Sequence, residues 1–232
     1  MAKNKKWILA AVAVLAVVLC CWAAWSKWAS TTRIGLVNFQ NYQTASLVKS
    51  NEDNFIEYEE IPLDRYDLVL GFGMGLKITE EQRAQILAAA DEGTPIYIYA
   101  ATNPENDICS LDSLTKAGIS AYIGNGNKRN YRNMARYVRQ HIDAKRLFVT
   151  PAEEAVESAS DVLYHLDEDL SFKTVADYEK YLREQGIYRE KAPKIAIVGG
   201  LNDPFSGNRA NIDSLIVSLQ NAGMNVYPVS SY

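Results

Sequence analysis

A long uncharged run near the N-terminus decides which part of this chain can form a water-soluble core. From Trp7 to Trp25 the sequence contains no charged residue and no proline. At ~1.5 Å per residue, a helix over this run is long enough to cross the ~30 Å hydrocarbon core of a bilayer. The sequence therefore predicts a membrane anchor over residues 1–30, with residues 7–25 inside the membrane.

The charges that flank this run predict its orientation. Lys3, Lys5 and Lys6 precede it, and by the positive-inside rule they keep the N-terminus in the cytoplasm. In a bacterial host this predicts a single-pass inner-membrane protein whose soluble part lies in the periplasm. A cleaved signal peptide is the alternative, because the small residues around Ala24 to Ser26 offer a weak cleavage site.

Short apolar runs alternate with helical patterns in the first soluble region. The helical pattern over residues 79–93 opens with a capping box formed by Thr79 and Gln82, and a second pattern covers residues 127–146. Strands alternating with helices are typical of a parallel sheet. The sequence predicts an α/β, doubly wound and mainly parallel domain of Rossmann or flavodoxin type over residues 31–151, with strands within 32–40, 66–73, 94–100 and 146–151.

The C-terminal region reads as the beginning of a second α/β domain. Residues 152–193 are interpreted as a linker with one helix, and residues 194–232 as a strand, a loop, a helix and a strand. One βαβ unit cannot shield both faces of its own sheet. We therefore expect this unit to be part of a larger domain, and the chain to be the N-terminal portion of a longer protein.

Composition argues against two classes of site. The formal net charge is −4 with both signs mixed, whereas a nucleic-acid-binding protein would usually show a basic excess. The chain has two histidines, His141 and His165, and its only cysteine outside the N-terminal run is Cys109. We expect no nucleic-acid partner and no resident metal site, because no zinc-type spacing exists.

Three features are candidates for ligand contact. Gly71 and Gly73 follow a predicted strand at its carboxyl end, the usual ligand side of an α/β sheet, although simple turn geometry is the alternative. His165 could ligate a metal or shuttle a proton, and a hydrogen-bonded structural histidine is the alternative. The third is the loop before the last helix, whose N-terminal N–H groups attract anions; its candidates are Asn202, Asp203, Ser206, Gly207 and Asn208.

A stripe of arginines marks the helical pattern over residues 127–146. Arg129, Arg132, Arg136 and Arg139 recur at three- and four-residue spacing. Such a stripe could meet propionates or another acidic group, because the guanidinium pairs well with carboxylates. A solvated helix face is the alternative.

The stretch "PKIAIVGGLNDPFSGNRANIDSLIVSLQNAGMNVYPV" resembles the start of the large domain in the CobN and magnesium-chelatase H-subunit family. The segment "YHLDED", which contains His165, resembles that family's histidine-containing segment. "LVNFQNYQTASLVKS" and "GFGMGLKITEEQ" resemble a membrane-anchored, HmuS-type branch linked to haem uptake and removal of iron from haem. Leu201, Asn202 and Asp203 depart from the family, whose loop often carries basic residues there.

This resemblance implies insertion of a metal ion into a tetrapyrrole, or its removal, with iron, cobalt or magnesium as the metal. It implies a catalytic centre mostly beyond residue 232, with His165 and the loop at 202–208 as contacts from this segment. Haem-uptake components or chelatase ATPase subunits are the implied partners. The alternatives are a non-catalytic, membrane-anchored α/β receptor module and, third, an assembly protein without a ligand.

Overall fold

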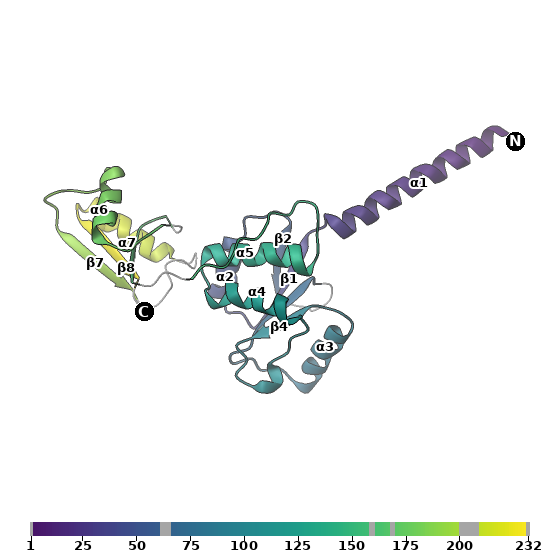
Figure 1. The fold of residues 1–232 in the computed structure, drawn as a ribbon, viewed down its shortest axis with the longest axis horizontal. Coiled ribbons are helices and arrows are strands. Elements are labelled where there is room, and N and C mark those ends of the chain that lie inside the picture. Colours follow the sequence, from purple (N-terminus) through teal and green to yellow (C-terminus); the bar gives the residue numbers. More distant parts are fainter. Residues whose placement is uncertain (1, 61–65, 158–160, 168–169, 200–208, 231–232) are drawn as a thin grey trace. The chain divides into compact units, whose positions relative to one another are not determined.

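The computed structural model describes residues 2–60, 66–157, 161–167, 170–199 and 209–230 (Figure 1). The chain divides into two compact units, and each takes its residues from separate stretches of the sequence. The first unit comprises Met1–Asn38, Asp53–Lys116 and Ala135–Ala152. The second comprises Phe39–Glu52, Ala117–Met134 and Glu153–Tyr232.

The first unit begins with a single long helix, α1, which spans Ala2–Trp28. Its stretch Ala11–Trp28 is long and apolar enough to cross a membrane, and none of that stretch is buried against the rest of the chain. The expected apolar N-terminal helix is therefore confirmed. Its insertion in a membrane stays a prediction.

A four-stranded parallel sheet, sheet A, forms the centre of the first unit. Its strands run in the order β2-β1-β3-β4, and every neighbouring pair is parallel. This confirms the predicted α/β class with a parallel sheet. The strands are β1 (Thr32–Val37), β2 (Ile56–Glu60), β3 (Leu68–Phe72) and β4 (Ile96–Tyr99).

Helix α3 (Glu80–Asp91) packs on sheet A through Ile86, which contacts a core built from β3 and β4. Its N-terminus carries the predicted capping box. The backbone amide of Gln82 donates to the Thr79 hydroxyl at 3.2 Å. The backbone amide of Thr79 donates to the side-chain oxygen of Gln82 at 2.9 Å. These bonds satisfy two backbone donors that the first turn of a helix leaves without partners.

The prediction of a strand within residues 146–151 is wrong. The amides of Arg146 and Leu147 donate to the Trp28 carbonyl at 3.2 and 2.9 Å, so they end α1 instead of joining a sheet. Phe148 has a φ of +54°, which is incompatible with an extended strand. The apolar residues that suggested a buried strand, Leu147 and Phe148, are in fact exposed.

The predicted helix over residues 127–146 is shorter than its pattern. It forms α5 (Lys128–Tyr137) and continues as a π-helical turn over Val138–Ile142. The helices α2 (Asn41–Ser50) and α4 (Ser113–Gly124) and a 3₁₀ turn at Pro104–Asn106 were not anticipated.

The arginine stripe on this helix is satisfied inside the chain. Arg129 pairs with Glu153 at 2.9 Å, and Arg132 pairs with Glu52 at 2.9 Å. Arg136 pairs with Asp53 at 3.0 Å, and Arg139 is buried. The stripe is thus neither a plain solvated face nor a set of unpaired cations.

A second sheet, sheet B, organises the second unit. Its strand order is β6-β5-β8-β7, with β7 parallel and β5 antiparallel to β8. Helix α7 (Ala210–Asn221) connects β7 to β8, so the βαβ unit expected there is present. The strands are β5 (Val162–Tyr164), β6 (Ser171–Phe172), β7 (Lys194–Gly199) and β8 (Asn225–Ser230).

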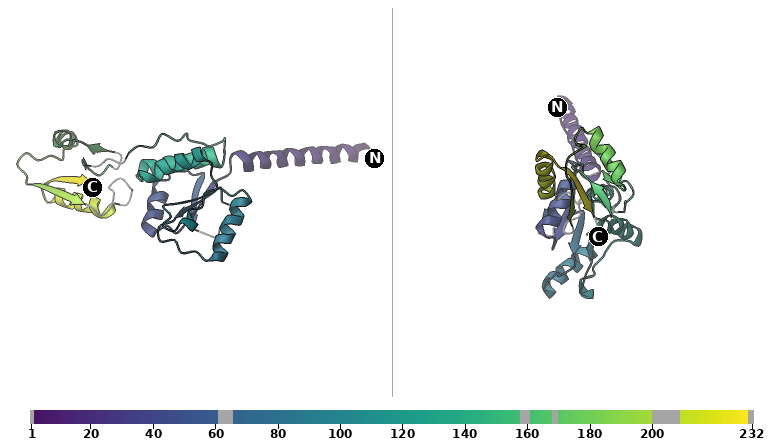
Figure 2. Two further views of the ribbon diagram at one scale, coloured as in Figure 1. Left: turned by 60° about the horizontal axis from the view of Figure 1, so that its bottom comes forward. Right: turned by 90° about the vertical axis from the view of Figure 1, so that its left-hand side faces the viewer.

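Sheet B also recruits the segment that the sequence analysis treated as a linker with a helix. Residues 152–193 supply β5, β6 and helix α6 (Val175–Glu184). Successive residues of a strand point to opposite faces. Tyr164 accordingly packs with Ile216 of α7, whereas Leu163 packs with Tyr178 of α6, so the two helices flank the strands (Figure 2).

Glu179 ties α6 to sheet B through a charged cluster. Its Oε1 atom accepts from the Lys194 ammonium of β7 at 2.6 Å and from the Tyr227 hydroxyl of β8 at 2.6 Å. These two donors stabilise the carboxylate and lower the pKa of Glu179 to about 2, and the same contacts raise the pKa of Lys194. The carboxyl must therefore be ionised for α6 to keep this attachment.

We expect this cluster to contribute an acid-sensitive part of the second unit's stability. The folded-state pKa of Glu179 lies below its ordinary value of 4.5, so the stabilisation is fully present above pH 4.5 and is lost as the pH falls toward about 2. Glu179→Gln should remove this part of the pH dependence, measured by urea unfolding at a series of pH values. Glu184→Gln is the matched control on the same helix, since it leaves Glu179, Lys194 and Tyr227 in place. Equal acid dependence in wild type and Glu179→Gln would contradict the assignment.

Candidate functional site around His165

His165 follows β5 directly and is buried, with 2% of its surface exposed. The antiparallel pairing of β5 with β8 brings it into the interior of the second unit. Its ring lies 5.6 Å from the ring of Tyr181 and 6.2 Å from that of Tyr178, both on α6. His165 is thus a buried histidine packed beside two tyrosine rings.

Gln220 of α7 holds the His165 ring from the other side. The Gln220 amide nitrogen lies 2.8 Å from Nε2 of His165. An amide nitrogen is a donor, so Nε2 accepts and the neutral ring carries its proton on Nδ1. Burial lowers the pKa of His165 below its ordinary value of 6.5, and the nearby Arg209 guanidinium lowers it further. His165 is therefore a neutral base at pH 7.

Arg209 is the charged residue of this site that the sequence analysis missed. Its guanidinium is buried, donates to the backbone carbonyl of His165 and pairs with Asp213 at 2.7 Å. It also lies 5.0 Å from the centre of the Tyr164 ring, within cation–π range. The available signal was local: Arg209 directly follows the loop that was singled out, and Asp213 lies one helical turn further on.

This arrangement can take up a proton at a shielded position. A neutral imidazole is a suitable general base at pH 7, and the adjacent Arg209–Asp213 pair fixes the backbone that carries it. Direct ligation of a metal ion by Nε2 would require Gln220 to turn away, because Gln220 already engages that nitrogen. Uptake of a proton at Nε2 requires only that the Gln220 amide group turns over, so that its oxygen accepts from the new N–H, and this favours proton handling over metal binding by this nitrogen.

The other predicted contacts lie elsewhere or outside the described residues. Asn202, Asp203, Ser206, Gly207 and Asn208 fall within residues 200–208, which the structure does not describe. What can be placed is the end of that loop, since Arg209 joins it to α7.

Gly71 and Gly73 belong to the first unit, at the carboxyl end of β3. A Cβ atom on Gly71 would lie 2.8 Å from Cγ1 of Ile98, and one on Gly73 would lie 2.5 Å from Cα of Ala101. Asn38 bonds the carbonyls of Phe72 and Met74 at 2.7 and 3.2 Å, which holds the same loop in place. Close packing thus accounts for both glycines, and their role in ligand contact stays a prediction.

Among the residues that the structure describes, no group of three or more histidine, cysteine, aspartate or glutamate side chains is placed to hold a metal ion. His141, the second histidine, is exposed, and its ring lies 4.5 Å from that of Tyr137. His165 is therefore the histidine around which the buried polar contacts gather.

Comparison with known proteins gives one finding on family. Residues 120–232 match the family model described as CobN/Magnesium Chelatase. No curated protein matches the chain. The matched stretch begins within α4 and contains His165, Arg209 and all of sheet B. This match supports the assignment of the C-terminal part of the chain to the CobN/magnesium chelatase family.

Proposed function

We propose that this chain is the N-terminal, membrane-anchored part of a chelatase subunit that acts on a tetrapyrrole, with removal of iron from haem as the preferred reaction. The observation that carries the proposal is the family match over residues 120–232. The resemblance of the N-terminal stretches to the HmuS-type branch favours haem over a corrin precursor. Cobalt or magnesium insertion is the alternative within the same family.

The role proposed for His165 follows from the chemistry of the reaction. When a metal ion leaves a porphyrin, two pyrrole nitrogens must gain protons, and insertion requires the reverse. A shielded imidazole can relay such protons: in removal it takes up a proton from solvent and delivers it to the macrocycle, and in insertion the direction is reversed. In this proposal His165 exchanges protons with the macrocycle, and residues 202–208 contact its periphery.

The macrocycle would be enclosed only in part by this segment. β7 lies at the edge of sheet B, and Val198 within it is 72% exposed. An exposed apolar side chain on an edge strand favours extension of the sheet by further strands. We propose that further structure extends the sheet at this edge and holds most of the catalytic centre.

The proposed location follows from α1. We place the helix in a bacterial inner membrane and both soluble units in the periplasm, where haem-uptake components would deliver the substrate. Chelatase ATPase subunits are the alternative partners. The apolar stretch Ala11–Trp28 supports the anchor.

The function is tested by incubating the full-length gene product with haem under anaerobic conditions and a reductant. We expect the haem absorption to fall while the fluorescence of metal-free porphyrin rises. His165→Ala should reduce the initial rate by on the order of 100-fold, the range in which a general acid–base group contributes. His141→Ala is the matched control and should keep the wild-type rate.

Two outcomes would contradict the proposal at different levels. If haem binds tightly but keeps its iron with every reductant tested, the chelatase hypothesis is wrong and the receptor-module hypothesis takes its place. Iron removal at an equal rate in wild type and His165→Ala would keep the function and exclude His165 from the site.

A further inference from the structure

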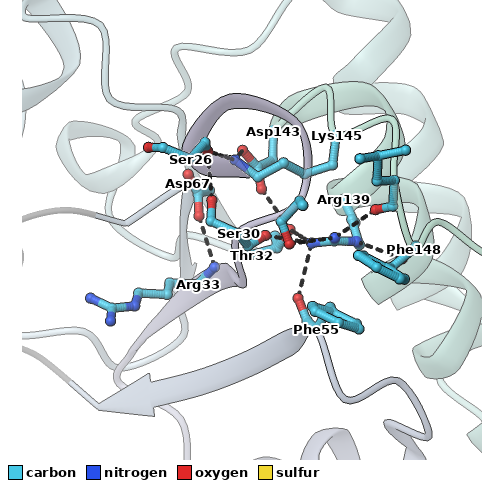
Figure 3. Close-up of polar contacts among 12 residues, drawn as sticks. Ser26, Ser30, Thr32, Arg33, Phe55, Asp67, Arg139, Asp143, Lys145 and Phe148 are labelled. Carbon is cyan, nitrogen blue, oxygen red and sulfur yellow. Dashed lines mark hydrogen bonds and ion pairs between the residues drawn. The ribbon is translucent and has the colours of Figure 1, made fainter. Parts of the chain in front are cut away.

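The end of α1 is bound to the first unit by a buried arginine (Figure 3). Arg139 is 1% exposed, and its guanidinium reaches the carbonyl of Ser30 at 2.9 Å and the hydroxyl of Thr32 at 2.9 Å. Lys145 adds a bond to the Ser26 carbonyl at 3.2 Å while it pairs with Asp143 at 2.9 Å. The last turn of the helix is thus held by side chains from the opposite end of the unit's sequence.

The same arginine fixes the backbone at residues 147 and 148. It donates to the carbonyl of Leu147 at 2.9 Å and to that of Phe148 at 3.0 Å. With both carbonyls turned inward, the two side chains face outward: Leu147 is 49% exposed and Phe148 is 56% exposed. Phe148 also has a left-handed backbone, which is costly for a bulky residue and persists only where its surroundings enforce it.

These exposed side chains continue an aromatic surface on α1. The ring of Phe148 lies 6.0 Å from that of Trp25 and is stacked on that of Phe55 at 4.5 Å. Trp25 and Trp28 are themselves exposed. Leu147 lies beside them, because its backbone amide donates to the Trp28 carbonyl at 2.9 Å. We call the surface formed by Trp25, Trp28, Leu147 and Phe148 the aromatic collar.

The depth of the aromatic collar relative to a bilayer follows from the apolar stretch Ala11–Trp28 of α1. The apolar stretch ends at Trp28, so the bilayer surface lies near Trp25 and Trp28 if α1 crosses the membrane. Tryptophan favours this depth, where its apolar ring and its N–H are both satisfied. Phe148 touches Trp25, so it lies at the same depth. The exposed side chains of Lys27 and Arg146 lie next to collar residues in the sequence, and their long stems allow the charges to reach the headgroups.

We propose that the aromatic collar is a membrane-contact surface, through which Leu147 and Phe148 enter the boundary between headgroups and acyl chains. This inference rests on the membrane anchor of the proposed function and adds to it a second point of lipid contact, distant in sequence from α1. It also explains why a buried arginine holds a strained, apolar loop open toward solvent. The partner is the bilayer that α1 itself spans.

The test measures the depth of single fluorescent probes in the full chain. In a background with Cys20→Ser, Cys21→Ser and Cys109→Ser, an environment-sensitive fluorophore is attached at Phe148→Cys, Met74→Cys or Val14→Cys. The protein is reconstituted into vesicles of phosphatidylcholine and phosphatidylglycerol that carry nitroxides at headgroup or mid-chain depth. Met74 is the matched control: it is 56% exposed like Phe148, but it follows the carboxyl end of β3, whereas α1 joins the amino end of β1.

We expect a blue shift of the Phe148 probe and a loss of its fluorescence with headgroup-level nitroxides, no change for Met74, and quenching of Val14 by mid-chain nitroxides. A Phe148 probe in water beside a quenched Val14 probe would overturn the collar and leave the anchor intact. A Val14 probe in water would overturn both. Equal quenching at Phe148 and Met74 would indicate general adsorption and also contradict the collar. Leu147→Cys is the second reporter if Phe148→Cys disturbs the fold.

Discussion

Arg139→Met is expected to lower the free energy of unfolding of the first unit by at least about 3 kcal/mol, because each buried acceptor left without a donor costs about 1–3 kcal/mol. The variant removes every bond of the guanidinium at once. The acceptors that lose this donor are the carbonyls of Ala29, Ser30, Leu147 and Phe148 and the hydroxyl of Thr32. The Phe55 carbonyl loses one of two donors and keeps its bond from the Thr32 backbone amide. Methionine fills similar volume but donates nothing. Urea unfolding followed by tryptophan fluorescence measures the effect, since Trp25 and Trp28 adjoin this cluster.

Arg33→Met is the matched control. Arg33 belongs to the first unit, and it pairs with Glu59 at the surface, where such a pair contributes about 0–1 kcal/mol. Arg139→Lys should recover only part of the loss, because an ammonium lacks the planar fork that reaches carbonyls on separate segments. Similar losses in Arg139→Met and Arg33→Met would show that the buried bonds do not stabilise the first unit.

Arg209→Met is expected to destabilise the second unit by roughly 2–4 kcal/mol. This is the sum of about 1–3 kcal/mol for one orphaned buried carbonyl and about 1 kcal/mol for one broken ion pair whose carboxylate is partly exposed. The His165 carbonyl loses its side-chain donor, Asp213 loses its cation, and the Tyr164 ring loses its cation–π partner. Hydrogen exchange at the amides of β5 and β8 should rise, because these strands flank the altered contact.

Lys180→Met provides the comparison for Arg209→Met. Its ammonium is 3.9 Å from Glu184, and 76% of its side chain is exposed. The variant should leave exchange in β5 and β8 unchanged. An Arg209→Met protein with wild-type exchange there would mean that Arg209 is not part of the structure that holds His165.

The parts of the fold that were predicted are those in which local pattern and tertiary burial agree. β3 is a short, continuous apolar run because it is a central strand with both faces buried. β4 lies at the edge of sheet A, but its residues Ile96, Tyr97 and Ile98 are buried as well, so it shows the same pattern. The edge strand β2 was missed because "IEYEE" is rich in acids and buries chiefly Ile56. Residues 146–151 were assigned to a strand on apolar content alone, yet their apolar side chains face outward.

Of the candidate site, only His165 was predicted from the sequence. His165 attracted attention because the chain has two histidines. Arg209 and Gln220 could not be connected with His165 from the sequence, because His165 lies far from both and meets them only once β5 pairs with β8. A three-residue strand such as β5 carries too little periodicity for that pairing to be read from the sequence.

The hydrogen bonds at the end of α1 leave no flexible linker between the helix and sheet A. Ala29 and Ser30 still bond to the Trp25 carbonyl, and β1 begins at Thr32. A swivel at this point would have to break the contacts of Arg139 and Lys145 together. If α1 crosses a bilayer, any tilt that the lipid imposes on the helix also rotates sheet A.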